Sequence, residues 1–180
     1  LYFMHENAVA LIEIKSKGVT VFDAPADYAP AWIKSAKKIL AEELKADWSK
    51  VSVQQADSSP ISYLTGGSGA IRGRYTNLRR AGAQAREMLI AAAAARLGVS
   101  PSLCRAENSK VIATIGGADT VFTFGELAAE ASLQPVPAAA SVPLTNPALF
   151  KIIGTTKPRF DIPAKTDGSA KFGLDVTLPG

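Results

Sequence analysis

The sequence contains few of the residues that form disulfides and zinc sites, namely cysteine and histidine. It has one cysteine, Cys104, and one histidine, His5. A single cysteine cannot form a disulfide within the chain, and these two residues cannot supply the Cys and His ligands of a conventional zinc finger. We therefore expect neither a disulfide framework nor a metal site in this chain.

Long apolar runs are also missing. The longest strongly apolar run spans 88–95, whereas a helix that crosses a bilayer needs about twenty such residues. The sequence therefore predicts no transmembrane segment. Hydrophobic residues still make up 47% of the chain, which is enough for a packed core. Residues 1–3 resemble part of a protease-cleavage tag and are left out of the fold prediction.

Charge of either sign is moderate, with 20 Lys and Arg against 16 Asp and Glu and a net charge of +4. The excess is concentrated in 72–110, which begins with five arginines: Arg72, Arg74, Arg79, Arg80 and Arg86. Arginine suits phosphate, but nucleic-acid binding also needs a broad basic face with stacking aromatic side chains. Only Tyr75 lies among these arginines, so we expect no nucleic-acid partner. The alternative explanation for this cluster of arginines is that they lie on a solvent-exposed helix face and bind no ligand.

The apolar periodicity predicts an α+β fold. Alternating segments around glycine turns indicate two hairpins, at 8–14 with 19–22 and at 111–115 with 120–124. Helical spacing predicts two main helices, one ending near Lys45 and one running from Thr76 or Asn77 to Leu97. The expected architecture is a mixed sheet packed against these two helices.

Smaller features complete this prediction. A strand is expected at 51–53, a helical turn after Ser100, and a short helix from 124 to 133. Gly98 is well placed as the left-handed residue that ends the long helix. Small residues within that helix, Gly82 among them, predict close packing on a sheet.

Composition divides the chain into three parts. Residues 8–134 carry the periodic segments, and 135–149 form a linker rich in proline and alanine. Residues 150–180 have strand character at 170–176 but are too few to bury a core of their own. We expect them to be the incomplete start of a next domain, with 170–176 as its first strand.

A glycine-rich loop is the most informative segment for function. It reads Thr65-Gly66-Gly67-Ser68-Gly69-Ala70-Ile71-Arg72-Gly73-Arg74 and precedes the long helix. Glycines let backbone N–H groups approach a ligand closely, and Arg72 adds a positive charge. The pattern predicts anion binding, but it matches neither a Walker loop nor a dinucleotide fingerprint. The structural alternative is a plain turn.

Several motifs occur together along most of the chain. They are Ala41-Glu42-Glu43-Leu44, Asp47-Trp48-Ser49-Lys50-Val51, Thr65-Gly66-Gly67-Ser68, Leu78-Arg79-Arg80-Ala81-Gly82-Ala83, Ala85-Arg86-Glu87-Met88-Leu89, Cys104-Arg105-Ala106-Glu107-Asn108, Pro163-Ala164-Lys165-Thr166-Asp167-Gly168-Ser169-Ala170 and Phe172-Gly173-Leu174-Asp175-Val176. In this joint spacing, over roughly 8–180, the chain resembles the large, molybdopterin-binding subunit of the xanthine dehydrogenase family. The isoquinoline 1-oxidoreductase and aldehyde dehydrogenase branch is the most similar.

The resemblance implies a molybdenum-cofactor oxidoreductase that hydroxylates aldehydes or N-heterocycles with oxygen from water. It also implies partners, namely the remaining domains of the same subunit, the next of which is hammerhead-like, and an iron–sulfur subunit that takes the electrons. The positions expected to contact molybdopterin are Gly66, Gly67, Ser68, Gly69 and Arg72. The family's catalytic glutamate belongs to a later domain. We therefore expect no catalytic residue here, and a fragment that scaffolds the cofactor cleft but is inactive alone.

Two alternatives come from other classes of protein. The family's Met-Gly-Gln-Gly motif corresponds here to Tyr28-Ala29-Pro30-Ala31, which favours a non-catalytic binding or assembly module that has lost cofactor contact. An independent anion- or RNA-binding domain built on the arginines would instead bind in a salt-sensitive manner. For Cys104, the neighbouring Arg105 predicts a lowered thiol pKa, although a packing role is the commoner one for a lone cysteine.

Overall fold

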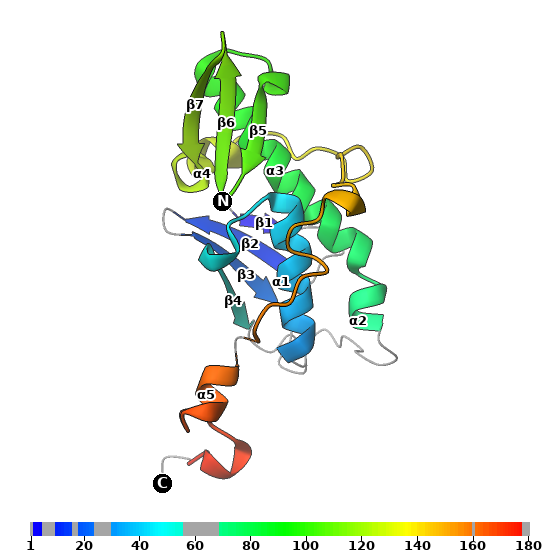
Figure 1. Ribbon diagram of the computed structural model, residues 1–180, viewed down its shortest axis with the longest axis vertical. Helices are drawn as coiled ribbons and strands as arrows, with labels where there is room; N and C mark the ends of the chain where they lie inside the picture. The colour runs from blue at the N-terminus through cyan, green and yellow to red at the C-terminus, as the bar shows by residue number, and fades with distance from the viewer. Residues whose placement is uncertain are drawn as a thin grey trace.

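The computed structural model describes residues 2–4, 10–15, 18–23, 30–55, 69–159 and 161–177. Two sheets are connected by a long helix, and the C-terminal residues extend away from this body (Figure 1). The α+β class predicted from the sequence is confirmed. None of the helices in the described ranges is long and apolar enough to cross a membrane.

The first sheet has the strand order β1-β2-β3-β4. The predicted hairpin is confirmed: β2 (Ala10–Lys15) pairs antiparallel with β3 (Gly18–Asp23). β1 (Tyr2–Met4), from the start of the chain that the fold prediction left out, pairs antiparallel with β2. β4 (Val51–Gln55) lies parallel to β3. Parallel neighbours need a crossover connection, and helix α1 (Pro30–Leu44) provides it.

α1 packs against the long helix α3 (Tyr75–Leu97), and this contact holds much of the core. Leu40, Leu44 and Leu78 are almost fully buried there. The close contact of Gly82 is with α1 rather than with a sheet, contrary to the prediction from the sequence. A Cβ at Gly82 would lie 2.9 Å from the Leu40 carbonyl oxygen and 3.0 Å from Glu43 Cβ, so only glycine permits this helix separation.

Both ends of α3 have a definite local cause. Gly98 adopts φ 65° and ψ 33° and ends the helix in the left-handed conformation, as predicted. The start differs from the prediction, because Arg74 rather than Thr76 or Asn77 precedes the first helical residue. The short helix α2 (Gly69–Arg72) leads into α3. The backbone of Arg74 therefore lies in the right-handed helical region, and its side chain forms no capping hydrogen bond.

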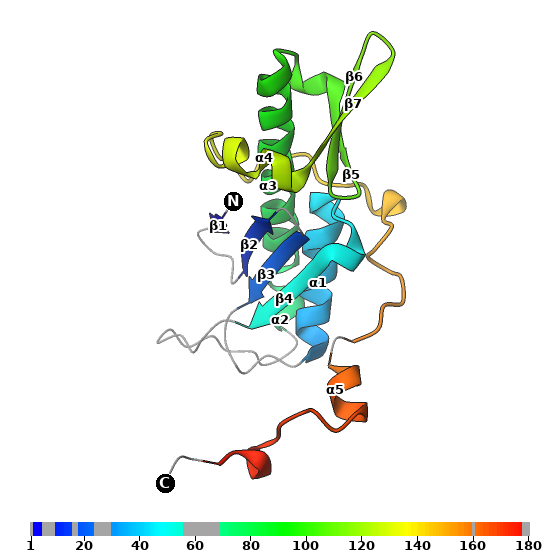
Figure 2. The same ribbon diagram turned by 90° about the vertical axis from the view of Figure 1, so that its left-hand side faces the viewer.

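The second sheet is an antiparallel meander of β5 (Cys104–Glu107), β6 (Lys110–Ile115) and β7 (Ala118–Thr123). It includes the second predicted hairpin. One turn of the 3-10 type, η2 (Pro101–Leu103), precedes it as expected after Ser100. Helix α4 (Phe124–Ser132) follows, with Thr123 and Glu126 forming a capping box. α3 packs on α4, β5 and β6 of this part, and it also packs on α1, which lies against the first sheet (Figure 2).

The C-terminal part differs from the prediction. Residues 170–176 form no strand: they are irregular apart from the 3-10 turn η4 (Gly173–Asp175), which follows the short helix α5 (Ile162–Thr166). A strand requires a hydrogen-bonded neighbour, and no described strand lies beside these residues. Phe172, Leu174 and Val176 are 58%, 101% and 64% exposed, so no core covers these apolar side chains within the described chain.

Candidate functional site

The predicted cofactor-contacting positions are only partly within the described residues. Gly66, Gly67 and Ser68 lie outside them, whereas Gly69 begins α2 and Arg72 ends it. The Arg72 side chain is exposed and forms no ion pair with any described residue. Within the described part of the chain, the Arg72 guanidinium is therefore left without an acidic partner.

Two other arginines of the basic stretch point inward. Arg79 Nε donates to Glu43 Oε1 at 2.6 Å, and the side chains of Arg79 and Glu43 are 11% and 0% exposed. Arg86 Nη1 lies 3.5 Å from Glu43 Oε2 and donates to the Glu43 carbonyl oxygen at 2.9 Å. These two arginines thus neutralise a buried carboxylate and are not free to bind a ligand.

The same network holds a distant part of the chain. Glu43 Oε2 accepts hydrogen bonds from the backbone N–H of Thr145 at 2.9 Å and from its hydroxyl at 3.0 Å. The guanidinium groups of Arg79 and Arg86 also donate to the carbonyl oxygens of Thr145 and Pro143. One buried carboxylate with two arginines therefore fixes residues 143–145 against α1 and α3.

The neighbouring carboxylate binds the residues that follow. Glu42 is 2% exposed, and its Oε2 accepts backbone hydrogen bonds from Lys151, Ile152 and Ile153 at 2.9, 2.6 and 3.0 Å. Such a nest of N–H groups is a favourable environment for a carboxylate. Glu42 and Glu43 together hold residues 143–153, which we call the strap, along α1.

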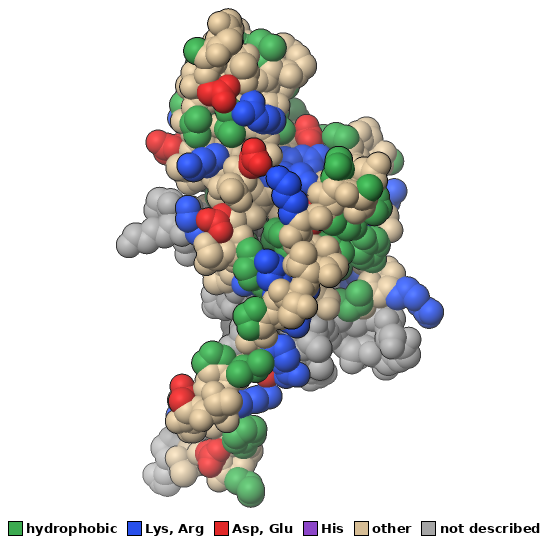
Figure 3. Space-filling model, in the orientation of Figure 1, with side chains coloured by type: hydrophobic (Ala, Val, Ile, Leu, Met, Phe, Trp, Pro, Cys, Tyr) green, Lys and Arg blue, Asp and Glu red, His purple; other side chains and the backbone are tan. Residues whose placement is uncertain are grey.

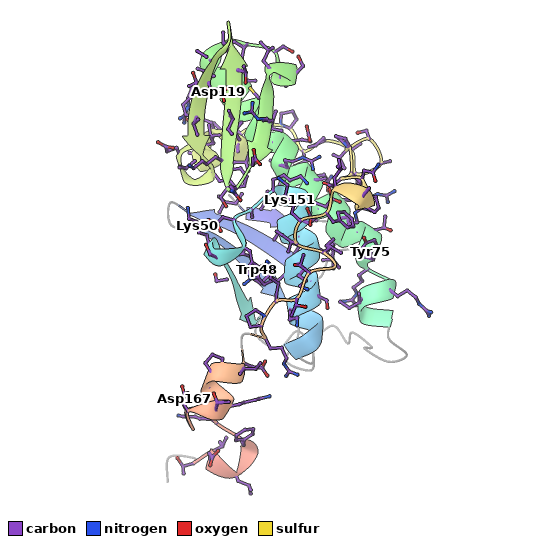
Figure 4. All side chains as sticks on the ribbon, in the orientation of Figure 1. Trp48, Lys50, Tyr75, Asp119, Lys151 and Asp167 are labelled. Atoms are coloured by element: carbon purple, nitrogen blue, oxygen red, sulfur yellow. The ribbon has the colours of Figure 1, made fainter. Side chains whose placement is uncertain are left out.

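The strap forms one wall of a groove of about 820 Å³. Its other walls come from the end of α1, the 3-10 turn η1 (Trp48–Lys50) and the β5–β6 turn. Trp48 lies beside the chain that leaves the strap, and Lys151 lies farther along the same side (Figure 4). The volume suits a small ligand or a short extended segment.

Ser109 connects these walls. Its backbone N–H donates to the Lys45 carbonyl oxygen at 2.9 Å, and its hydroxyl accepts from Asp47 N–H at 2.9 Å. The Ser109 carbonyl oxygen accepts from Phe124 N–H at 2.9 Å. The second sheet is thereby joined to the end of α1 on one side and to α4 on the other.

Cys104 does not have the environment predicted from its neighbour. Burial raises the pKa of the Cys104 thiol. Arg105, which was expected to lower this pKa, points to the other face of the sheet, where it donates to Thr114 Oγ1 at 2.9 Å and to Asp119 Oδ2 at 3.2 Å. A raised thiol pKa disfavours the thiolate, and this agrees with a packing role.

Sequence reasoning missed Glu42 and Glu43 as the residues that organise this region. Two adjacent acids near the end of an apolar helical pattern cannot both face solvent when the helix is covered on several sides. A second signal was the spacing of Arg79 and Arg86, since residues seven apart lie on one helix face. Their pairing with Glu43 could have been suspected from these two patterns together.

Comparison with known proteins agrees with the motifs. Residues 2–170 match the family model described as the molybdopterin cofactor-binding domain. The chain is 34% identical to a membrane-bound aldehyde dehydrogenase (pyrroloquinoline-quinone) of Gluconacetobacter polyoxogenes, over 79% of this chain and 19% of that protein. It is 32% identical to the beta subunit of the isoquinoline 1-oxidoreductase of Brevundimonas diminuta, over 79% of this chain and 23% of that protein.

A third relative covers nearly the whole chain. A nicotinate dehydrogenase subunit of Pseudomonas putida is 32% identical over 97% of this chain and 15% of its own length. The chain thus spans at most 23% of these relatives. Among solved structures, quinoline 2-oxidoreductase from Pseudomonas putida 86 matches 66% of this chain and 15% of its own, with 22% identity and a TM-score of 0.48.

Proposed function

Because the chain belongs to the molybdopterin cofactor-binding domain family, we propose that it is part of an oxidoreductase that hydroxylates aldehydes or N-heterocycles. The match across residues 2–170 is the observation that carries this proposal. The relatives' names, which include isoquinoline 1-oxidoreductase and nicotinate dehydrogenase, support this substrate class. When bound, the molybdenum cofactor supplies the redox chemistry, and water supplies the oxygen.

The role proposed for this chain is to form one wall of the cofactor cleft. Gly66, Gly67, Ser68 and Gly69 provide a backbone with little side-chain bulk, which lets N–H groups approach a ligand. Arg72 follows directly, and its exposed guanidinium has no acidic partner in the described chain. An exposed arginine next to such a loop fits the anionic phosphate of a pterin cofactor.

The strap is proposed to set the direction in which the chain continues. Glu42 and Glu43 fix residues 143–153 on α1, so the chain leaves the body at a defined place. We infer a division into a first domain at 8–134, a linker at 135–149 and the start of a next domain at 150–180. The proline-rich linker is bound to the first domain and is not a free tether. The further domains and an iron–sulfur subunit are the proposed partners.

The alternative, a binding or assembly module without cofactor contact, has one observation in its favour. Pro30, which stands within the position of the family's Met-Gly-Gln-Gly motif, is the first residue of α1. A proline has no N–H to donate, so this part of the chain offers a ligand one donor fewer. The two functions differ in whether the glycine loop binds an anionic ligand.

Titration with a pyrophosphate-containing nucleotide tests the proposed loop contact. We expect the 180-residue chain to bind at millimolar concentration or tighter, and Arg72→Ala to weaken binding about tenfold, since a charge-assisted contact is lost. Lys110→Ala, at an exposed position in β6, is the matched control and should leave affinity unchanged. Undetectable binding, or equal binding by wild type and Arg72→Ala, would favour the assembly module.

A further inference from the structure

Four lysines gather where the chain leaving the strap crosses α1. Lys34, Lys37 and Lys38 belong to α1, and Lys157 belongs to the crossing segment. All four are partly exposed, and none forms an ion pair with a residue of the described chain. We call them the four-lysine face. Figure 3 shows basic side chains along this front of the molecule.

Three of these side chains are held by specific contacts. Lys37 Nζ lies 4.0 Å from the centroid of the Trp48 ring, and Lys157 Nζ lies 5.7 Å from it. Lys38 Nζ donates to the Thr155 carbonyl oxygen. Cation–π and carbonyl contacts keep the ammonium groups in place without neutralising them. The positive charge is therefore ordered on the surface.

The lysines also repel one another. Burial lowers the pKa of Lys38, and the charges of Lys34 and Lys157 lower it further. Lysines around the adjoining groove are in a different situation, because Lys45 pairs with Glu42 at 3.7 Å and Lys151 with Glu107 at 3.3 Å. Among the lysines that line the groove, Lys45 and Lys151 are thus paired with carboxylates, whereas Lys157 has no counter-charge among the described residues.

The four-lysine face and the groove are continuous. Trp48 and Lys157 line the groove of about 820 Å³ and also belong to the lysine contacts. A ligand that follows the groove past Trp48 therefore reaches Lys157 and then Lys38 and Lys34. The surface is elongated and does not converge on one point.

We propose that this surface binds an acidic, extended segment of a partner protein, with carboxylates over the four-lysine face and the adjoining residues in the groove. Ammonium groups are separate point charges, which suit carboxylates spaced along a peptide, whereas phosphate sites favour arginine forks or helix N-termini. None of the four is an arginine, and they lie within α1 and beyond the strap. The proposal goes beyond the proposed function and does not depend on cofactor binding.

A labelled all-glutamate peptide is the probe, and fluorescence anisotropy at low salt is the measurement. We expect saturable binding to the 180-residue chain, with Lys157→Glu weakening the affinity about tenfold, since one attraction is replaced by a repulsion. Lys171→Glu makes the same change in net charge at an exposed position in the C-terminal segment and should leave affinity unchanged. The neutral variants Lys34→Gln and Lys157→Gln should each weaken binding less than the reversal does.

Three results would overturn the proposal. The first is that the peptide does not bind, and the second is that Lys157→Glu and Lys171→Glu weaken its affinity equally. The third is that pyrophosphate or a nucleic-acid duplex displaces the peptide at a lower concentration than unlabelled peptide does. Near-ultraviolet circular dichroism confirms that each variant is folded. Arg72→Ala separates the two proposals, because α2 and the crossing segment lie on different sides of α1 (Figures 1 and 2), and it should leave peptide affinity unchanged.

Discussion

At the residue scale, the most consequential group is the carboxylate of Glu43. It is fully buried, and it is neutralised by Arg79 and Arg86 while also accepting two hydrogen bonds from Thr145. A buried ion pair with its remaining hydrogen bonds satisfied adds little net stability compared with an apolar replacement, but removal of one partner leaves the other charges buried alone. Loss of one member of this network is therefore expected to cost more than the intact network contributes to stability.

Replacement of Glu43 by glutamine tests this directly. We expect Glu43→Gln to lower the free energy of unfolding by about 3–5 kcal/mol, because the guanidinium of Arg79 loses its carboxylate partner. Of its carboxylate contacts, Arg86 keeps only the one with Glu87, at 2.9 Å. Urea denaturation measures the change. The control is Glu107→Gln, which breaks an exposed pair with Lys151 and should alter stability by less than about 1 kcal/mol. Similar small losses in both variants would show that the buried network contributes no more than a surface pair.

At the element scale, the separation of α1 and α3 depends on a single glycine. Gly82→Ala would gain up to about 1 kcal/mol of helix propensity. The new methyl group would, however, meet the Leu40 carbonyl oxygen at 2.9 Å, and backbone atoms cannot move aside cheaply. We expect a net loss of about 1–3 kcal/mol in the free energy of unfolding.

The matched control is Ala95→Gly, at an exposed position of α3, which reports helix propensity alone and should destabilise by up to about 1 kcal/mol. A Gly82→Ala protein that is more stable than wild type would mean that the two helices can separate without loss. Thermal and urea unfolding of both variants provide the comparison.

Elements whose cause is local were predictable from the sequence. The hairpins β2–β3 and β6–β7 follow from alternation around a short turn, and Gly98 follows from its place after the last helical residue. The strap was not predictable, because its proline-rich residues have no periodicity and its bonds to Glu42 join positions more than a hundred residues apart. The prediction of a strand at 170–176 was wrong for a related reason, since alternation alone does not provide a neighbouring strand.

At the scale of the whole molecule, the candidate site was only partly predictable. The motifs indicated the family, and the family model confirms it. They also directed attention to five arginines, yet Arg79 and Arg86 turn out to be internal, and burial of this kind depends on tertiary packing. The groove brings together the end of α1, η1, the β5–β6 turn and the strap, and the four-lysine face brings together α1 and Lys157, which follows the strap. No local pattern could place them together.

The molybdenum content of the complete subunit tests the central claim most directly. We expect the purified wild-type subunit to contain molybdenum in stoichiometric amount, and Gly67→Val to reduce this occupancy strongly, because a branched side chain blocks close backbone approach. Lys110→Ala should retain full occupancy, and the 180-residue chain alone should hold no stoichiometric metal. A wild-type subunit without molybdenum, or a Gly67→Val subunit as fully loaded as wild type, would contradict a cofactor role for the glycine loop.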